Sequence, residues 1–357
     1  MLERIIQFRE LLENWNVEGV LITSSTNRRW LSGFNGSAGS LLITPNKAIL
    51  STDSRYWEMV KRQAPSFTLF QHRNEKDDTL NFLRSAEVAT IGIEAKYVSI
   101  AEWENFNKLD GFEWKPLDTT VEELRIVKSN DEIKTIHAAA KITDRTIDYF
   151  SRIVHPGMSE RELVWELEKF MREEGADRPG FDIIVASGPN GALPHHQSGE
   201  RELEEGDVII VDLGAEVRGY KSDLTRTFYL GNSADSRFWE VYNVVRKAQE
   251  AAISGLQPQM TGKEGDALAR DVIVAAGFGD SFGHGTGHGV GLDIHEAPRL
   301  FRQGNKDTLP AGAVVTIEPG IYIPGWGGVR LEDLVHLTHN GAQLLSQAPK
   351  SPLIPVD

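Results

Sequence analysis

The chain of 357 residues contains no cysteine, which excludes disulfides, thiolate nucleophiles and cysteine-based zinc or iron–sulfur sites. Any metal ion must therefore be held by nitrogen and oxygen ligands. The chain also has no apolar run long enough to cross a bilayer. Its first residues, MLERIIQFRELLENW, are charged from the third position and follow helical spacing, as in an amphipathic surface helix rather than a signal peptide. We therefore expect a cytoplasmic protein.

Basic residues are fewer than acidic ones, with 38 Lys and Arg against 52 Asp and Glu and a net charge of −14. This balance argues against nucleic acid or an anionic membrane surface as a partner, because both require clustered basic side chains. An acidic chain can still bind cations. The length favours two domains, and the 40% hydrophobic and 25% charged residues are typical of a globular chain.

Helical and strand patterns alternate in the first third of the chain, which predicts an α/β layer domain. Strands are expected near residues 17–23, 38–44, 47–52, 68–71 and 90–95. The pattern changes to long helical periodicity within LDTTVEELRIVKSNDEIKTI, residues 117–136. We place the domain boundary there, with an amino-terminal domain over residues 1–123 and a second domain over residues 124–357.

The second domain contains an internal repeat. HPGMSERELVWELEKFMREEGA (155–176) and QPQMTGKEGDALARDVIVAAGF (257–278) share Pro, Met, Ser or Thr and a final Gly in register. Each predicts a turn, a capped amphipathic helix and a glycine at the helix end. A strand that enters a hairpin follows each of them, at 206–230 and 312–337. We therefore expect two α/β halves, with any site at their junction built from both.

Acidic residues occupy matching places in the two halves. Asp212 follows the apolar run VIIV, and Glu318 follows VVTI. Each hairpin then returns with a second acid, Asp223 or Glu332, and strand alternation places Glu332 opposite its competitor Asp333. A single carboxylate at a strand end could simply cap a turn. Four that converge need a compensating cation, and a pair of ions such as Mn²⁺, Co²⁺ or Zn²⁺ suits them.

Histidine is concentrated in FGHGTGHGVGLDIHE, residues 282–296, where glycine fills alternate positions. No window of this segment fits GxGxxG, so it is not a phosphate loop. A metal site and a surface turn both remain possible. If the segment is extended, its glycine face lets another backbone or a bound peptide approach closely. His195, in LPHHQ, is by itself only a weak functional candidate. The HExxH, GxSxG and Walker A motifs are absent.

Taken together, VDLGAEVRGYKSDLTRTF, GHGTGHGVGLDIHE, IEPGIY and GVRLED resemble the successive signatures of the pita-bread metallopeptidases, in the Xaa-Pro aminopeptidase and prolidase branch (family M24B). RRWLSGFNGSAG and TDSRY resemble the amino-terminal domain of that branch. The resemblance implies an α/β (α+β) chain, in which a creatinase/prolidase-like α/β domain precedes a catalytic pita-bread domain of two pseudo-symmetric α/β halves.

The same resemblance implies a dinuclear metal site. Asp223 and Glu332 would bridge two divalent ions, His288 and Glu318 would complete the coordination of one ion, and Asp212 that of the other. His195, His284 and His295 match histidines that contact the substrate, and Arg330 matches an arginine near the site. Mn²⁺ is the first expectation for the metal, with Co²⁺ or Zn²⁺ as alternatives.

The implied activity is that of a metallo-aminopeptidase, which hydrolyses the Xaa-Pro bond at the N-terminus of peptides through a bridging hydroxide activated by the two ions. Glu318 would accept the proton. GFNGSAG and TDSRY favour this activity over that of an Xaa-Pro dipeptidase, or prolidase, restricted to dipeptides. A non-catalytic peptide-binding module is the remaining alternative. The expected partners are peptides with proline at the second position and a second copy of the chain in a homodimer.

Overall fold

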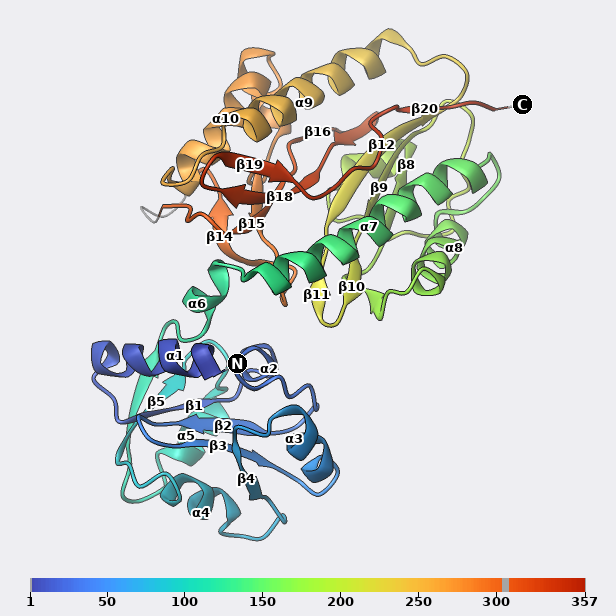
Figure 1. The fold of residues 1–357 in the computed structure, drawn as a ribbon. Helices are drawn as coiled ribbons and strands as arrows, with labels where there is room; N and C mark the ends of the chain where they lie inside the picture. Colours follow the sequence, from blue (N-terminus) through green and yellow to red (C-terminus); the bar gives the residue numbers. More distant parts are fainter. Residues whose placement is uncertain (1, 304–307, 357) are drawn as a thin grey trace. The chain divides into compact units, whose positions relative to one another are not determined.

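The computed structural model describes residues 2–303 and 308–356, and it divides the chain into two compact units, Met1–Arg125 and Ile126–Asp357 (Figure 1). Each unit has its own sheets and its own hydrophobic core. The expected α/β class, with an amino-terminal domain followed by a domain of two related halves, is confirmed.

The amino-terminal unit is built on a six-stranded sheet in the order β4-β3-β2-β1-β5-β6. Strand β2 pairs antiparallel with its neighbours β1 and β3, and the other neighbouring strands pair parallel. The strands are β1 (Gly19–Ile22), β2 (Ser40–Ile43), β3 (Ala48–Thr52), β4 (Thr68–Gln71), β5 (Thr90–Glu94) and β6 (Glu113–Leu117). The helices are α1 (Leu2–Trp15), α2 (Ser25–Ser32), α3 (Trp57–Gln63), α4 (Asp78–Arg84) and α5 (Ile100–Phe106), and α6 (Glu122–Ile126) runs across the unit boundary.

All five strands predicted for this unit are present, and the sixth, β6, was not predicted. Its sequence EWKPL lies at the sheet edge, where only Leu117 is buried. An edge strand needs no continuous apolar pattern and tolerates a proline such as Pro116, so hydrophobic periodicity does not detect it.

The second unit consists of two halves with the same arrangement of elements. The first half contains α7 (Asn130–Ile153), α8 (Glu160–Glu173) and the sheet β20-β12-β9-β8. The second contains α9 (Ser236–Gly255), α10 (Gly262–Ala275) and the sheet β14-β13-β15-β18-β19. The strands of the first sheet are β8 (Ile184–Ser187), β9 (Val208–Leu213), β12 (Leu224–Leu230) and β20 (Leu353–Ile354), and those of the second are β13 (Gly287–Gly289), β14 (Glu296–Leu300), β15 (Val314–Ile317), β18 (Asp333–Thr338) and β19 (Gly341–Leu344).

Each half also contains smaller elements. The first has β7 (Arg178–Pro179), the short helix η1 (Gly188–Ala192) and the hairpin β10 (Ala215–Val217) with β11 (Tyr220–Lys221). The second has η2 (Gly279–Ser281) and the hairpin β16 (Gly320–Ile323) with β17 (Gly327–Arg330). In both halves the hairpin lies between the two central strands in sequence, so the expected repeat of strand, hairpin and returning strand is confirmed.

Corresponding helices of the two halves begin in the same way. The hydroxyls of Ser159 and Thr261 accept the backbone N–H of Glu162 and Glu264, whose carboxylates accept the N–H of the capping residue in return. This reciprocal bonding satisfies donors that a helix start leaves open. The predicted caps therefore fix where α8 and α10 begin.

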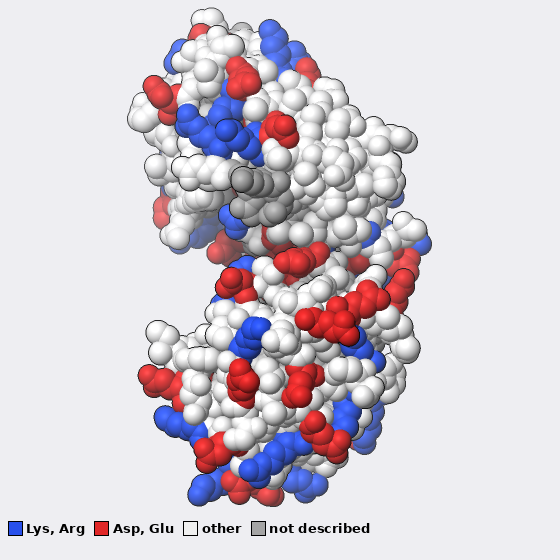
Figure 2. Space-filling view, turned by 90° about the vertical axis from the view of Figure 1, so that its left-hand side faces the viewer, with Lys and Arg blue, Asp and Glu red and all other residues white. Residues whose placement is uncertain are grey.

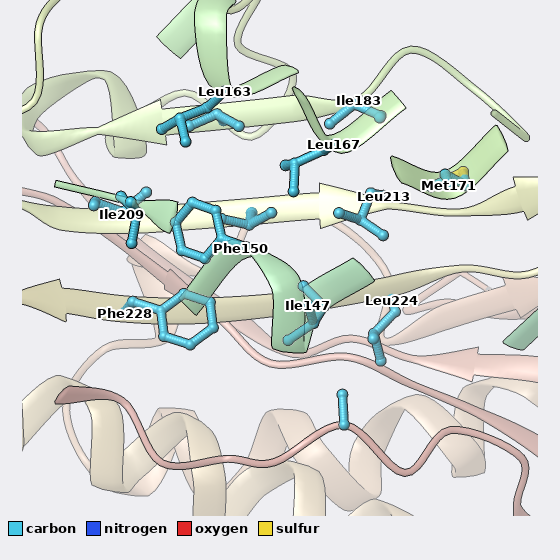
Figure 3. Packing of buried hydrophobic residues seen from close by; sticks show 14 of the residues in the cluster. Ile147, Phe150, Leu163, Leu167, Met171, Ile183, Ile209, Leu213, Leu224 and Phe228 are labelled. Carbon is cyan, nitrogen blue, oxygen red and sulfur yellow. The ribbon is translucent and has the colours of Figure 1, made fainter. Parts of the chain in front are cut away.

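Helices α7 and α8 cover one face of the β8-β9-β12 sheet. Phe150 of α7 packs against Phe228 of β12 with ring centroids 5.0 Å apart, and Leu163 and Leu167 of α8 join the same fully buried cluster as Ile209 of β9 (Figure 3). Burying each such side chain contributes about 1.5–3 kcal/mol. This core packs against β9, which contains the predicted acidic residue Asp212, and β12, which directly follows the predicted Asp223.

Within the described residues, no helix has the length and apolar character needed to pass through a membrane. Figure 2 shows acidic and basic side chains interspersed over the visible surface rather than gathered into a basic patch.

Candidate active site

The four predicted acidic residues lie at strand ends of both halves of the second unit. Asp212 is in β9 and pairs with Thr225 of β12, so that Asp223, just before β12, lies beside it. In the other half, Glu318 directly follows β15 and Glu332 directly precedes β18, and these strands are neighbours. The buried strands thus bring four carboxylates to one place.

A cavity of about 310 Å³ opens at this place. Its lining includes all nine residues that the sequence analysis selected: Asp212, Asp223, Glu318, Glu332, His195, His284, His288, His295 and Arg330. Phe181, Ile184 and Phe301 supply apolar wall. The structure therefore brings together residues that are far apart in the sequence and leaves none of the nine outside.

His288 faces the acidic residues with one ring nitrogen. Its Nε2 lies 3.4 Å from Glu318 Oε1 and 3.6 Å from Asp223 Oδ2, while Nδ1 lies 3.1 Å from the carbonyl oxygen of Gly289. Burial lowers the pKa of His288, which favours the neutral ring. A proton on Nδ1, donated to that carbonyl, leaves the Nε2 lone pair directed at the carboxylates, as in a metal-binding histidine.

The acidic cluster carries more negative charge than an enclosed site tolerates. Burial raises the pKa of Asp223 well above its ordinary value, and the charges of Glu332, Asp212 and Glu318 raise it further. The pKa of Glu332 is raised well above its ordinary value by burial and by the charges of Glu318 and Asp212. Burial likewise raises the pKa of Glu318. Such carboxylates ionise together only beside a cation.

Two further observations fit a divalent cation. Ligand atoms of Asp223, His288 and Glu332 all lie within 4.8 Å of one another. Asp212 Oδ1 is buried and accepts no hydrogen bond from the described residues, whereas its Oδ2 accepts one from Arg330 Nη2 at 2.6 Å. A buried carboxylate oxygen without a donor is costly, and a metal ion would satisfy it. The residues present therefore fit the predicted ions.

Arg330 forms the centre of a network on one wall of the cavity. Besides Asp212, it donates to Tyr322 Oη at 2.8 Å and to Thr225 Oγ1 at 3.0 Å, and Thr225 in turn donates to Glu332 Oε2 at 2.7 Å. Burial alone would lower the pKa of Arg330, but Tyr322, Asp212 and Glu318 raise it well above its ordinary value. The guanidinium therefore stays charged beside the acidic cluster.

Tyr322 and Thr225 were not predicted from the sequence. Tyr322 Oη lies 2.9 Å from His284 Nε2, so it connects that histidine to Arg330. Its only sequence signal was its place in the IEPGIY motif. Spacing along the chain does not reveal which hydroxyl meets which side chain, because Thr225 of β12 and Arg330 of β17 come into contact only in the folded domain.

Asp333, the competitor for the place of Glu332, points elsewhere. Its carboxylate accepts from Arg226 Nη2 at 2.7 Å and pairs with Lys350 Nζ at 2.6 Å. It does not line the cavity, whereas Glu332 does.

Two glycines of the 282–296 segment, Gly287 and Gly289, give room to the backbones of neighbouring strands. A Cβ at Gly287 would overlap the carbonyl oxygen of Thr316 in β15, and one at Gly289 would overlap that of Ala297 in β14. Residues 287–289 of the segment form β13, which lies between β14 and β15 in the sheet. The expectation that the glycines let another backbone approach closely is therefore confirmed at Gly287 and Gly289. Room for a bound peptide stays a prediction, and Gly285 and Gly287 are among the residues that line the cavity.

A buried ion pair holds the first part of this segment. Arg270 of α10 donates to Asp266 at 2.9 Å, and to the carbonyl oxygens of Phe282 at 3.0 Å and His284 at 2.6 Å. Asp266 also accepts the backbone N–H of Thr286 at 2.9 Å. The pair fixes the backbone between His284 and His288.

The remaining histidines differ in their surroundings. The His295 ring lies 4.4 Å from that of His288, and burial together with the charges of His288 and Arg299 lowers the pKa of His295 to about 4. His195 lines the cavity at its exposed side. Its neighbour His196 turns away and contacts Glu160 Oε2 at 2.7 Å.

Comparison with known proteins agrees with this geometry. The model of metallopeptidase family M24 matches residues 134–339, and that of the creatinase/prolidase N-terminal domain matches residues 4–127. The chain is 40% identical to an uncharacterized peptidase, YqhT, of Bacillus subtilis, over 98% of this chain and 99% of the relative.

Two solved structures have the same fold over nearly their full length. An Xaa-Pro dipeptidase from Bacillus anthracis superposes with a TM-score of 0.96 at 38% identity, covering 99% of both chains. An X-Pro aminopeptidase from Thermotoga maritima superposes with a TM-score of 0.89 at 34% identity, covering 96% of this chain and 98% of the other.

Proposed function

The chain belongs to metallopeptidase family M24, and we propose that it hydrolyses the peptide bond between an N-terminal residue and a proline at the second position. The observation that carries this proposal is the meeting of four carboxylates, two of them buried and two partly buried, with His288 in one cavity, drawn from both halves of the second unit. The names of the two superposed structures support proline at the second position of the substrate.

We propose that two divalent ions, with Mn²⁺ as the first candidate, bind to Asp212, Asp223, His288, Glu318 and Glu332. Asp223 and Glu332 would be shared by the two ions, a role that the resemblance to the family implies, and their ligand atoms lie within 4.8 Å of that of His288. When bound, such ions supply Lewis acidity and lower the pKa of water towards neutrality. The five residues offer the nitrogen and oxygen atoms that these ions prefer.

The residues of the chain supply the proton transfers and hold the substrate. Glu318, whose pKa is raised by burial, is the proposed base: it accepts a proton from the attacking water and passes it to the departing proline nitrogen. Arg330, His195 and His284 line the cavity and are the proposed hydrogen-bond donors for the oxyanion. A prolyl bond has no N–H, so the apolar wall of Phe181 and Phe301 suits its ring.

For substrate length, we propose the dipeptide. The dipeptidase from B. anthracis is more similar to this chain, with a TM-score of 0.96, than the aminopeptidase from T. maritima, with 0.89. The sequence motifs favour longer peptides instead, so the aminopeptidase activity is the second candidate.

A side-by-side assay tests both the proposed hydrolysis of Xaa-Pro bonds and the proposed preference for dipeptides. Purified protein is loaded with Mn²⁺, Co²⁺ or Zn²⁺ and offered Ala-Pro, Ala-Pro-Ala and, as a control, Ala-Ala. We expect release of alanine from Ala-Pro and none from Ala-Ala. Turnover of Ala-Pro-Ala at an equal or higher kcat/KM identifies an aminopeptidase. Full metal loading without hydrolysis of any Xaa-Pro substrate would instead identify a peptide-binding module.

A further inference from the structure

Glu160, the first residue of α8, is a fully buried acid outside the cavity of the active site. Its Oε1 accepts from the backbone N–H of Ser187 at 2.8 Å, the hydroxyl of Ser187 at 2.7 Å and Asn190 Nδ2 at 2.9 Å. Its Oε2 accepts from His196 Nε2 at 2.7 Å and the backbone N–H of Gly199 at 3.1 Å. Five donors on one carboxylate compensate for the loss of hydration.

All five donors belong to one segment, residues 187–199, and this segment carries His195 to the cavity. The four residues that donate lie on both sides of His195 in sequence. Arg330 Nη1 also donates to the carbonyl oxygen of Pro194, the residue before His195, at 3.3 Å. The backbone next to His195 is therefore held by hydrogen bonds to both Glu160 and the arginine of the active site.

Glu160 is not needed to begin its helix. The start of α8 is capped by Ser159 and Glu162, which bond to each other's backbone N–H. In the related half, α10 has the same kind of cap, but its first residue is Gly262, where a Cβ would overlap the carbonyl oxygen of Arg299. The carboxylate at the start of α8 is thus a departure from the symmetry of the domain, found on the side that carries His195.

We propose that Glu160 is a positioning residue, which holds the 187–199 segment so that His195 stays directed into the active site. His196, the second histidine of the LPHHQ motif, serves the same purpose as a donor to Glu160. The inference rests on the proposed peptidase function and on a role for His195 in it. Displacing a reacting group by about 1 Å can lower the rate about 100-fold, so Glu160 would influence catalysis without touching the substrate.

The test is a double-mutant cycle with a matched control. Glu160→Gln, Glu160→Ala and His195→Ala are assayed on Ala-Pro with Mn²⁺, alone and combined, and Glu162→Gln is the control because it weakens the same helix start without touching the segment. We expect Glu160→Ala to lower kcat/KM about 100-fold, with partial rescue by Gln. In the His195→Ala background, neither substitution should lower it further. Independent, multiplying losses in the double variants contradict the inference.

Hydrogen exchange of the 187–199 segment separates this inference from the peptidase proposal, since it needs no substrate. We expect faster exchange there in Glu160→Gln and unchanged exchange in Glu162→Gln. If the wild type hydrolyses Ala-Pro but the segment exchanges equally in all variants, the positioning role is wrong and the peptidase proposal stands. If Glu160→Ala does not fold, Glu160→Gln and His196→Ala complete the cycle.

Discussion

At the scale of single residues, His288 has an unusual position for a histidine: its uncharged Nε2 faces acidic groups at 3.4 and 3.6 Å. Burial, the largest influence, lowers its pKa, so the ring does not neutralise those acids by protonation. The cluster therefore needs a different cation, and the histidine is ready to bind it.

His288→Ala should remove at least one bound ion and abolish hydrolysis, because it deletes the nitrogen ligand of the proposed site. Metal content, measured by mass spectrometry after dialysis, is expected to fall from about two ions per chain to one or fewer. His295→Ala is the matched control: it lines the same cavity but is not a proposed ligand, so it should keep both ions. Full activity in His288→Ala would contradict the ligand assignment.

Arg330→Lys should lower kcat by about 100-fold while most of the metal stays bound. Lysine keeps the charge but loses the planar fork that reaches Asp212, Thr225 and Tyr322 together. Steady-state kinetics and metal analysis on the same sample check this. An unchanged kcat would show that the guanidinium serves only to hold the wall of the cavity.

The residues predicted from the sequence are those whose chemistry is visible along the chain. Asp212 and Glu318 follow apolar runs, and the repeat between the halves made their pairing visible. Tyr322, Thr225 and Glu160 were not predicted as part of the site, since their roles depend on partners more than a hundred residues away or on loops without a pattern. A polar residue in a strand looks the same whether or not the fold gives it a partner.

At the scale of elements, the glycine-rich strand β13 shows how packing decides a pattern that the sequence leaves open. Its alternating glycines were expected to let another chain segment approach closely. In the structure, the backbones of β14 and β15 occupy that space. Close backbone approach on both sides holds His288 in register.

Gly287→Ala should therefore destabilise the domain, because its Cβ would overlap the carbonyl oxygen of Thr316. We expect the free energy of unfolding to fall by about 2–3 kcal/mol, with loss of activity. Gly283→Ala is the matched control, since nothing lies within 4 Å of a Cβ there, and its effect should stay within about 0.5 kcal/mol. Equal urea midpoints for the two variants would contradict this account of the glycines.

Helices α8 and α10 were predicted with their caps because a capping box is a local signal, contained in four consecutive residues. Strand β6 was not predicted, because at a sheet edge burial is one-sided and the apolar pattern fades. Capping residues thus allow helix starts to be predicted from the sequence, whereas an edge strand lacks the apolar pattern by which strands are predicted.

At the scale of the whole molecule, the internal repeat of the sequence predicted the architecture, since each half must bury its own sheet under its own pair of helices. The detailed site required the fold, in which returning strands of both halves bring their acidic ends together.

Metal removal should destabilise the second unit. A ligand at 100 times its Kd stabilises the folded state by about 2.7 kcal/mol, which corresponds to a Tm shift of about 5–10 °C for a domain of this size. Calorimetry with and without a chelator measures the shift. Asp223→Ala, which removes a proposed shared ligand, should show almost no response to chelation, whereas an equal shift in that variant would place the stabilising ion elsewhere.

Anomalous X-ray diffraction from crystals of the protein grown with Mn²⁺ tests the central claim most directly. The account predicts two neighbouring peaks at the manganese edge, bound by Asp212, Asp223, His288, Glu318 and Glu332. Anomalous density absent from this cavity, or centred on other residues, would contradict it.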